Sequence, residues 1–106
     1  MSVERPLEGK VAVVTGGRRG IGREIVIGLA SEGADIVYNY VDPDRRKQKR
    51  NEEVDVLARD FGVRITSVMA DITKPKDRRA LLVAVLADHP QGIDYLILNA
   101  AGGLEE

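Results

Sequence analysis

Short apolar runs alternate along this chain with longer segments in which apolar residues return every three or four positions. Four runs rich in valine, isoleucine and tyrosine predict strands at residues 10–15, 35–40, 63–70 and 93–98. The helical spacing between them predicts helices at residues 20–31, 48–61 and about 75–88. The chain therefore alternates strand and helix from its first strand to its last.

Turn residues separate these elements. Gly33 and Gly62 follow the first two helical segments as helix stops. Before the third, Thr73 is expected to cap the helix, with Pro75 in its first turn. In that helix we expect four apolar residues to face inward: Ala80, Leu81, Ala84 and Val85.

This alternation predicts an α/β fold in which helices cover both faces of a parallel sheet. Right-handed crossovers then restrict the topology to a doubly wound sheet, with strand order 3-2-1-4, in one domain spanning residues 1–106. The fourth strand would lie at an edge, and its sequence "YLIL" is very apolar for that place. We expect more chain or a partner to cover it, and the isolated chain to self-associate or to stay partly unfolded.

Composition narrows the possible partners. A formal net charge of −1 and few aromatic residues, one Phe and three Tyr, argue against nucleic-acid binding by the basic run "RRKQKR". With no cysteine, the chain has no disulfide and no thiolate metal site. The first ten residues include several charged side chains and no apolar segment, so they do not have the pattern of a secretory signal. No apolar run approaches the roughly 20 residues of a membrane span. We expect a soluble, cytoplasmic protein without a membrane partner.

The glycine-rich stretch "TGGRRGIG", Thr15 to Gly22, lies where the first strand meets the first helix. Glycines let the backbone turn tightly and approach a pyrophosphate, while amides at the helix start point toward the anion. A P-loop is excluded because no Gly-Lys-Ser/Thr follows. The stretch therefore predicts a dinucleotide site.

Three motifs, in order, resemble the short-chain dehydrogenase/reductase family. "TGGRRGIG" is similar to its cofactor motif, and "ADIT", residues 70–73, to the segment after the third strand in which an aspartate, here Asp71, faces the adenine. "GIDYLILNAAGG", residues 92–103, is similar to the fourth strand and its Asn-Ala-Gly end, although Ala101 takes the glycine position and Gly102 shifts the glycine by one. The resemblance covers nearly the whole chain. It implies the N-terminal, cofactor-binding half of a three-layer Rossmann-type fold.

The resemblance also implies a set of cofactor-binding residues: Thr15, Gly16, Arg18, Arg19, Gly20, Ile21, Gly22, Asn39, Tyr40, Asp71, Ile72, Asn99, Ala100 and Ala101. A sheet that binds NAD usually ends its second strand with an acid that bonds the ribose 2′-hydroxyl. Here that place is near Asn39 and Tyr40, which are not acidic, while two arginines in the turn suit a phosphate. In the family, a basic residue at the position of Arg19 accompanies NADP, which we favour over NAD. If the strand ends later, Asp42 could meet a 2′-hydroxyl instead.

The family reduces carbonyls or oxidises alcohols by hydride transfer, with a serine, a tyrosine and a lysine four residues after the tyrosine. The tyrosines of this chain are followed at that distance by Asp42, Asp44 and Asn99, so no catalytic residue is assigned. We expect the NADP-binding portion of such an oxidoreductase, inactive alone, whose carbonyl or alcohol substrate requires a C-terminal half. The alternative is a non-catalytic module that binds or senses NADP.

The other residues that could take part in catalysis or bind a metal are expected to have structural roles. His89 is expected at the surface of a helix end, and Met69 and Phe61 are expected in the core. Tyr38 and Tyr95 are expected in the core or on a sheet face. Acidic residues in the second helix, Glu52, Glu53 and Asp55, lack a histidine beside them, so we expect no metal site.

Overall fold

The computed structural model describes residues 5–18, 20–41 and 49–99 of the chain. The elements follow in the order β1 (Val11–Val14), α1 (Gly20–Ser31), β2 (Asp35–Tyr40), α2 (Lys49–Phe61), β3 (Ile65–Met69), α3 (Pro75–Asp88) and β4 (Tyr95–Ile97). The predicted bounds of α1 and β2 are confirmed, whereas β1, β3 and β4 are each shorter than predicted by two or three residues.

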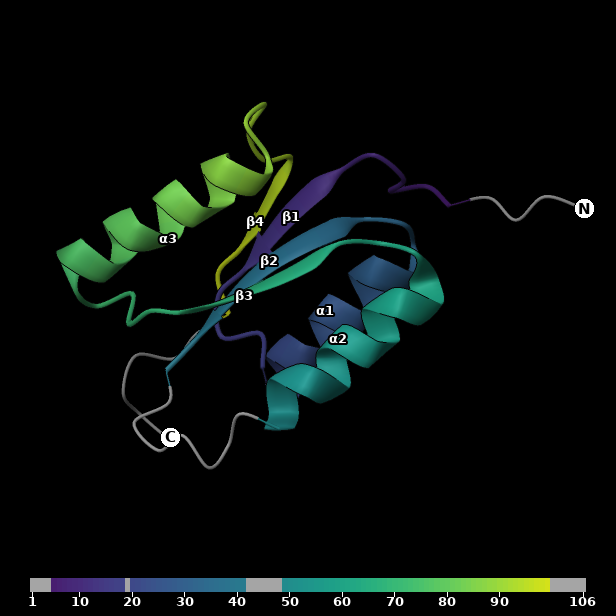
Figure 1. The fold of residues 1–106 in the computed structure, drawn as a ribbon, viewed down its shortest axis with the longest axis horizontal. Coiled ribbons are helices and arrows are strands. Elements are labelled where there is room, and N and C mark those ends of the chain that lie inside the picture. Colours follow the sequence, from purple (N-terminus) through teal and green to yellow (C-terminus); the bar gives the residue numbers. More distant parts are fainter. Residues whose placement is uncertain (1–4, 19, 42–48, 100–106) are drawn as a thin grey trace, which may run out of the picture.

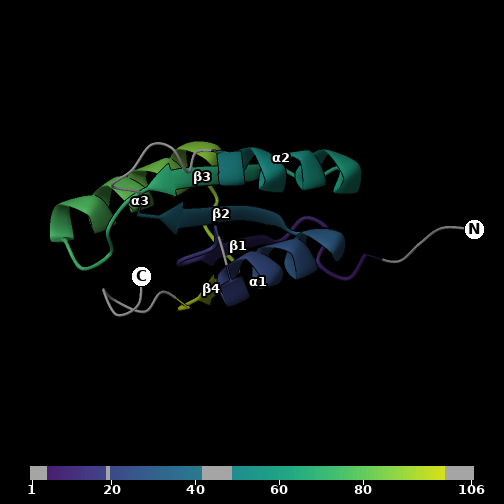
Figure 2. The same cartoon turned by 90° about the horizontal axis from the view of Figure 1, so that it is seen from below.

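The four strands form one parallel sheet in the order β3-β2-β1-β4, as predicted. Helices α1 and α2 cover one face and α3 covers the other, which gives three layers (Figure 1). Seen from below, the strands follow one another from β3 to β4 across the molecule (Figure 2). Because all strands are parallel, their carboxyl ends share one edge of the sheet.

Each face of the sheet has its own apolar core, because successive side chains of a strand point to opposite faces. The core under α1 and α2 consists of Ala12, Val14, Val26, Ala30, Ala34, Ile36, Tyr38 and Val54. The core under α3 is smaller and consists of Val13, Val37, Ala70, Leu81 and Val85. Both strands at the centre of the sheet, β1 and β2, are therefore buried on both faces, as their continuous apolar runs predicted.

The buried stripe of helix α1 consists of Gly22, Val26 and Ala30. Each lies one residue after a large apolar residue of the sequence pattern. Val26 and Ala30 are fully buried, whereas Ile21 is 74% exposed. Ile25 and Leu29 lie at the border of the stripe, packed against the core. The small residues Gly22 and Ala30 thus face the sheet, so the helix can lie close to the strands.

Two predictions about α3 are wrong. Lys74, not Thr73, is the N-cap, and no side chain caps the helix. The Thr73 hydroxyl instead donates to the Asp71 carboxylate, 2.6 Å away, because a carboxylate two residues earlier offers a closer partner than the helix start. Ala80 is exposed rather than inward, and the buried residues of the helix are Leu81 and Val85.

Two further burial predictions need correction. Met69 is 60% exposed, because it ends the outer strand β3, which has a neighbouring strand on one side only. His89 does lie at a helix end, but it is only 8% exposed, and its backbone N–H donates to the Val85 carbonyl. Phe61 packs against the core under α1 and α2.

In the described part of the chain, no helix combines the length and the apolar character that crossing a membrane requires.

Candidate functional site at the carboxyl edge of the sheet

The glycine turn joins β1 to α1 at the carboxyl edge of the sheet. Gly16 and Gly20 have φ angles of 70° and 60°, in the left-handed region that favours glycine. Gly17 lies against β2, where a Cβ atom would come within 2.5 Å of the Tyr38 Cβ. The turn is therefore shaped by backbone conformation at its ends and by a close approach to β2 in its middle.

Gly22 lies in the first turn of α1, directly behind the glycine turn. A Cβ atom there would collide with the Gly16 carbonyl oxygen and lie 2.6 Å from the Asn99 amide nitrogen. The first turn of a helix leaves backbone N–H groups without intrahelical partners, and these attract anions. The missing side chain at Gly22 lets those amides sit next to the turn.

Asn99 and Thr15 tie the turn to the segment that follows β4. The Asn99 N–H donates to the Thr15 hydroxyl at 2.8 Å, and its side-chain amide donates to the Gly16 carbonyl at 3.1 Å. The Thr15 N–H donates to the Ile97 carbonyl at 3.0 Å. Two residues of the predicted cofactor set thus hold the backbone of the glycine turn in place.

Asn39 ties the other side of the turn to β2 and β3. Its side-chain oxygen accepts from the Gly16 N–H at 2.9 Å, and its side-chain nitrogen donates to the Ala70 carbonyl at 2.8 Å. The residue is only 2% exposed. The sequence predicted Asn39 beside the cofactor ribose, but both ends of its amide are engaged inside the protein. The polar residue within an apolar strand was the signal for this role.

Arg18 packs against the end of β2. Its guanidinium carbon lies 4.6 Å from the centroid of the Tyr40 ring, within the range of a cation–π interaction. One guanidinium nitrogen reaches the Val41 carbonyl at 3.5 Å, and the residue is 4% exposed. The turn therefore brings a cation to the strand end where the sequence showed no acid.

Tyr38 lies below Tyr40 on the same face of β2, with ring centroids 6.5 Å apart. It is fully buried, which confirms its predicted place in the core. Burial raises the pKa of Tyr38 to about 12, and the nearby Asp55 charge adds to the rise. A phenol with so high a pKa is a poor proton donor near neutral pH.

Asp71 follows β3 at the same edge. Its carboxylate accepts from the Thr73 hydroxyl at 2.6 Å and from the Thr73 N–H at 2.9 Å, and these bonds lower the pKa of Asp71. The Asp71 N–H donates to the Asp77 carboxylate at 2.8 Å. Asp71 therefore carries a negative charge at neutral pH and has a fixed orientation. Its neighbour Ile72 packs against the core under α3.

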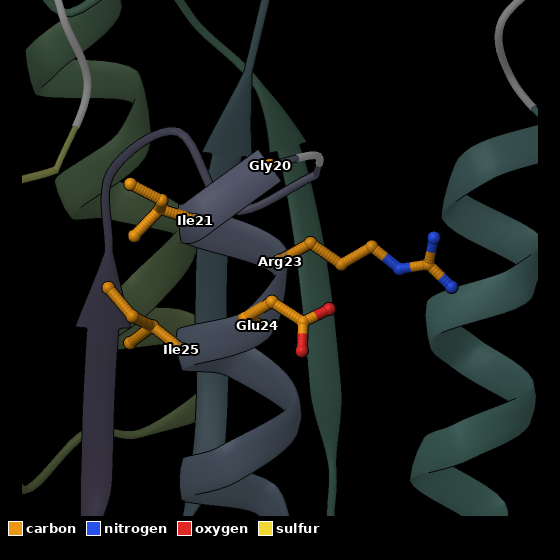
Figure 3. Close-up of a pocket in the computed structure, with 5 residues that line it drawn as sticks. All are labelled: Gly20, Ile21, Arg23, Glu24 and Ile25. Atoms are coloured by element: carbon orange, nitrogen blue, oxygen red, sulfur yellow. The ribbon is translucent and has the colours of Figure 1, made fainter.

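Arg19, Ala100, Ala101 and Asp42 lie outside the described residues, as do residues 45–48 of the basic run. Ile21 and Ile25 point to one side of α1 and Arg23 and Glu24 to the other, around a shallow depression of about 600 Å³ (Figure 3). This depression lies on the outer surface of the helix, beside the strand ends. Within the described ranges, no three His, Asp or Glu side chains come together as a metal site requires.

The residues at this edge suit a nucleotide that carries phosphate. The glycine turn leaves space that side chains would otherwise fill, beside the start of a helix. At the end of β2, Asn39, Tyr40 and Val41 bring no carboxylate, and Arg18 lies next to the Tyr40 ring.

Comparison with known proteins extends this picture. A sequence model of a family described as short chain dehydrogenase matches residues 10–106. A tetrahydroxynaphthalene reductase of Pestalotiopsis fici is 41% identical over 96 residues, which are 91% of this chain and 33% of that protein. Mouse dehydrogenase/reductase SDR family member 4 is 36% identical over 91% of this chain and 32% of its own length. The chain thus spans about a third of the length of these relatives.

Solved structures have the same fold. L-sorbose reductase from Gluconobacter frateurii, in complex with NADPH and L-sorbose, superposes with a TM-score of 0.80 at 35% identity, over 98% of this chain and 38% of the other. Carveol dehydrogenase from Mycobacterium avium, in complex with NAD, gives a TM-score of 0.79 at 26% identity, over 95% of this chain and 38% of the other.

Proposed function

The chain belongs to the short-chain dehydrogenase/reductase family, and on this premise we propose that it is the NADP-binding portion of an oxidoreductase acting on a carbonyl or an alcohol. The observation that carries the proposal is the glycine turn, held between Asn39 and Asn99 beside the start of α1. Such a turn offers backbone amides to a pyrophosphate in a fixed geometry. Residues 1–106 are taken as a single domain.

The proposed cofactor extends across the carboxyl edge of the sheet. Gly16, Gly20, Ile21 and the first turn of α1 would hold its pyrophosphate. Asp71 and Ile72 would contact its adenine, and Asn99, Ala100 and Ala101 would line its ribose and nicotinamide. When bound, the nicotinamide supplies or accepts a hydride. The protein's part is to hold and orient it.

NADP is proposed over NAD because the end of β2 has no acid for a ribose 2′-hydroxyl, while Arg18 and Arg19 lie in the turn. The related L-sorbose reductase was solved with NADPH, which supports this choice, whereas carveol dehydrogenase was solved with NAD. An Asp42 that bonded the 2′-hydroxyl would favour NAD.

Dissociation constants for NADPH and NADH, measured by calorimetry on the chain and on Arg19→Ala, test this proposal. We expect tighter binding of NADPH, and a loss of about tenfold or more on replacing Arg19, confined to NADPH. Tighter binding of NADH would overturn the choice of NADP. Failure to bind either nucleotide would overturn the function itself.

The chemistry of the whole protein also belongs to this proposal. The substrate is a carbonyl or alcohol bound only together with a C-terminal half, and the chain by itself is expected to be inactive and to self-associate. The cytoplasmic location stays a prediction.

The second candidate is a module that binds NADP without catalysis. Within residues 1–106, no tyrosine is followed four residues later by a lysine. Turnover of a carbonyl substrate separates the two.

A further inference from the structure

Two side chains from the first turn of α3 hold the β3–α3 turn, residues 70–74, at the carboxyl edge of the sheet (Figure 1). The Asp77 carboxylate accepts from the Asp71 N–H at 2.8 Å, and the Arg78 guanidinium donates to the Ile72 carbonyl at 2.8 Å. Each of these side chains reaches six residues back along the chain. Together they fix the backbone at both ends of the dipeptide Asp71–Ile72.

These contacts supply partners that neither the sheet nor the helix provides. The bonds between β2 and β3 end with the Ala70 N–H, which donates to the Tyr40 carbonyl at 2.9 Å. The next N–H along the chain, that of Asp71, therefore needs another acceptor, and a carboxylate is a strong one. Asp77 is the third residue of α3, where an acid commonly reaches back to the N-cap, here Lys74. In this chain it passes the N-cap and reaches the end of the strand instead.

The same turn leaves one oxygen of the Asp71 carboxylate available to a ligand. Asp71 Oδ1 accepts both bonds from Thr73, at 2.9 Å from its N–H and at 2.6 Å from its hydroxyl. Among the residues that the structure describes, no group donates to Asp71 Oδ2. An ionised carboxylate only accepts hydrogen bonds. The turn therefore offers an acceptor to a ligand N–H group.

Such an acceptor distinguishes between purine rings. Adenine carries an amino group at position 6, which donates, whereas hypoxanthine carries a carbonyl oxygen there, which accepts. A carboxylate that meets position 6 favours adenine only while it is held in place, and a displacement of about 0.5 Å already weakens such a contact. The groups that hold the turn therefore matter to recognition as much as the carboxylate itself.

We propose that Asp77 and Arg78 are positioning residues for the recognition of adenine at the β3–α3 turn. This inference rests on the proposed function, in which Asp71 and Ile72 contact the adenine ring. The two α3 side chains act through the backbone of that dipeptide and not by contact with the nucleotide. They keep Asp71 Oδ2 within reach of the 6-amino group.

The test compares NADPH with its hypoxanthine counterpart, in which a carbonyl oxygen replaces the 6-amino group. Calorimetry on the chain gives both dissociation constants, and their ratio is the readout. Asp77→Ala is expected to lower the preference for adenine about fivefold, and Arg78→Met, which keeps a long side chain without a donor, about threefold. Asp77→Asn keeps an oxygen that can accept from the Asp71 N–H, so we expect its ratio to stay within about twofold. The same ratio for NADH and its hypoxanthine counterpart makes the result independent of which cofactor is preferred.

Asp60→Ala is the matched control. Asp60 is exposed near the end of α2, at the amino edge of the sheet, so its loss removes the same charge far from the turn. We expect this variant to leave the ratio within about twofold. The two probes differ only at position 6. A change in net charge or a loss of folded protein therefore affects both alike, and the ratio reports how the turn is held.

The outcomes separate this inference from the function on which it rests. A ratio that falls for Asp77→Ala and Arg78→Met, but not for Asp77→Asn or Asp60→Ala, supports the inference. Equal weakening of both probes would mean that the two side chains serve only the fold, and would overturn it. An unaltered chain that binds both probes without preferring adenine would also overturn it, while the function stands. If no dinucleotide binds the unaltered chain, the function fails and the inference with it.

Discussion

At the scale of single residues, the site depends on polar side chains that the fold turns inward. Asn39 is the main case, because one amide joins the Gly16 N–H of the turn to the Ala70 carbonyl at the end of β3. A buried amide that uses both its donor and its acceptor is costly to replace by a group that offers only one. Asn39 therefore fixes the position of the glycine turn relative to the outer strand.

Replacing Asn39 by Asp tests this role. The carboxylate keeps the acceptor for Gly16 but loses the donor to Ala70 and brings an uncompensated charge toward a carbonyl oxygen. We expect the free energy of unfolding at pH 7 to fall by about 1–3 kcal/mol, measured by urea denaturation, and to recover partly when the carboxyl is protonated at low pH. An unchanged urea midpoint at pH 7 would contradict the role assigned to this amide.

Tyr38 predicts how stability depends on alkaline pH. Its pKa in the folded chain is raised to about 12, from about 10 in an unfolded chain. The neutral phenol therefore favours folding fully below pH 10, and this contribution is lost as the pH rises toward 12. The loss amounts to about 2 kcal/mol.

Urea denaturation between pH 8 and 11.5 measures this dependence on the chain and on Tyr38→Phe, which has no phenol to ionise. We expect a smaller loss of stability in the variant, and a part of the tyrosinate absorbance that develops near pH 12 in the unaltered chain and is missing from Tyr38→Phe. Identical pH profiles of the two proteins would show that the phenol ionises without lowering the free energy of unfolding, and would contradict the prediction.

At the scale of elements, α1 shows how one helix uses glycine in two different ways. Gly22 faces the turn, and a Cβ atom there would collide with the Gly16 carbonyl. Gly28 is exposed in the middle of the helix, and a Cβ atom there would contact nothing within 4 Å. The same residue type is thus required at one position and only tolerated at the other.

The substitutions Gly22→Ala and Gly28→Ala form a matched pair in α1. We expect Gly22→Ala to displace the turn and to weaken binding of NADPH and NADH alike by at least about tenfold, because the pyrophosphate is common to both. Gly28→Ala is expected to raise the free energy of unfolding by about 0.5–1 kcal/mol, since alanine is the better helix former. Calorimetry and urea denaturation measure the two effects. Equal nucleotide affinities in the two variants would argue against the close approach at Gly22.

At the scale of the whole molecule, β4 leaves an apolar edge at one side of the sheet. Tyr95 is 41% exposed, Leu96 54% and Leu98 76%. On α3, which covers the neighbouring face, Leu82 is 57% and Val83 63% exposed. An apolar strand at a sheet edge readily pairs with another chain, because its backbone groups add to its apolar surface.

Self-association through this edge is therefore expected for the chain in isolation. Leu96→Lys places a charge on β4 and should shift sedimentation velocity profiles toward monomer, with little effect on the fold. Val83→Lys changes an apolar residue of similar exposure on α3 and is the matched control, with a smaller effect expected. A sharp two-state melt of a monomeric, unaltered chain would contradict the prediction. Equal effects of the two variants would point to general apolar exposure instead of strand pairing.

Much of the fold was predictable because its determinants are local. Apolar runs and helical periodicity predicted every element in the described part of the chain, and the handedness of crossovers predicted strand order. Burial was less predictable. Met69 was expected in the core but is exposed, and His89 was expected at the surface but is buried. The exposure of a side chain depends on which distant elements cover it.

By itself, the sequence determined the order of elements, the doubly wound sheet and the position of the glycine turn, because each follows from periodicity or from residues a few places apart. Only the tertiary structure decided which groups hold that turn. The Gly16 backbone lies between Asn39 and Asn99, and Arg18 lies on Tyr40, across 22 or more residues of chain. Such contacts form only when parallel strands bring their carboxyl ends to one edge, and the spacing of residues along the chain does not encode them.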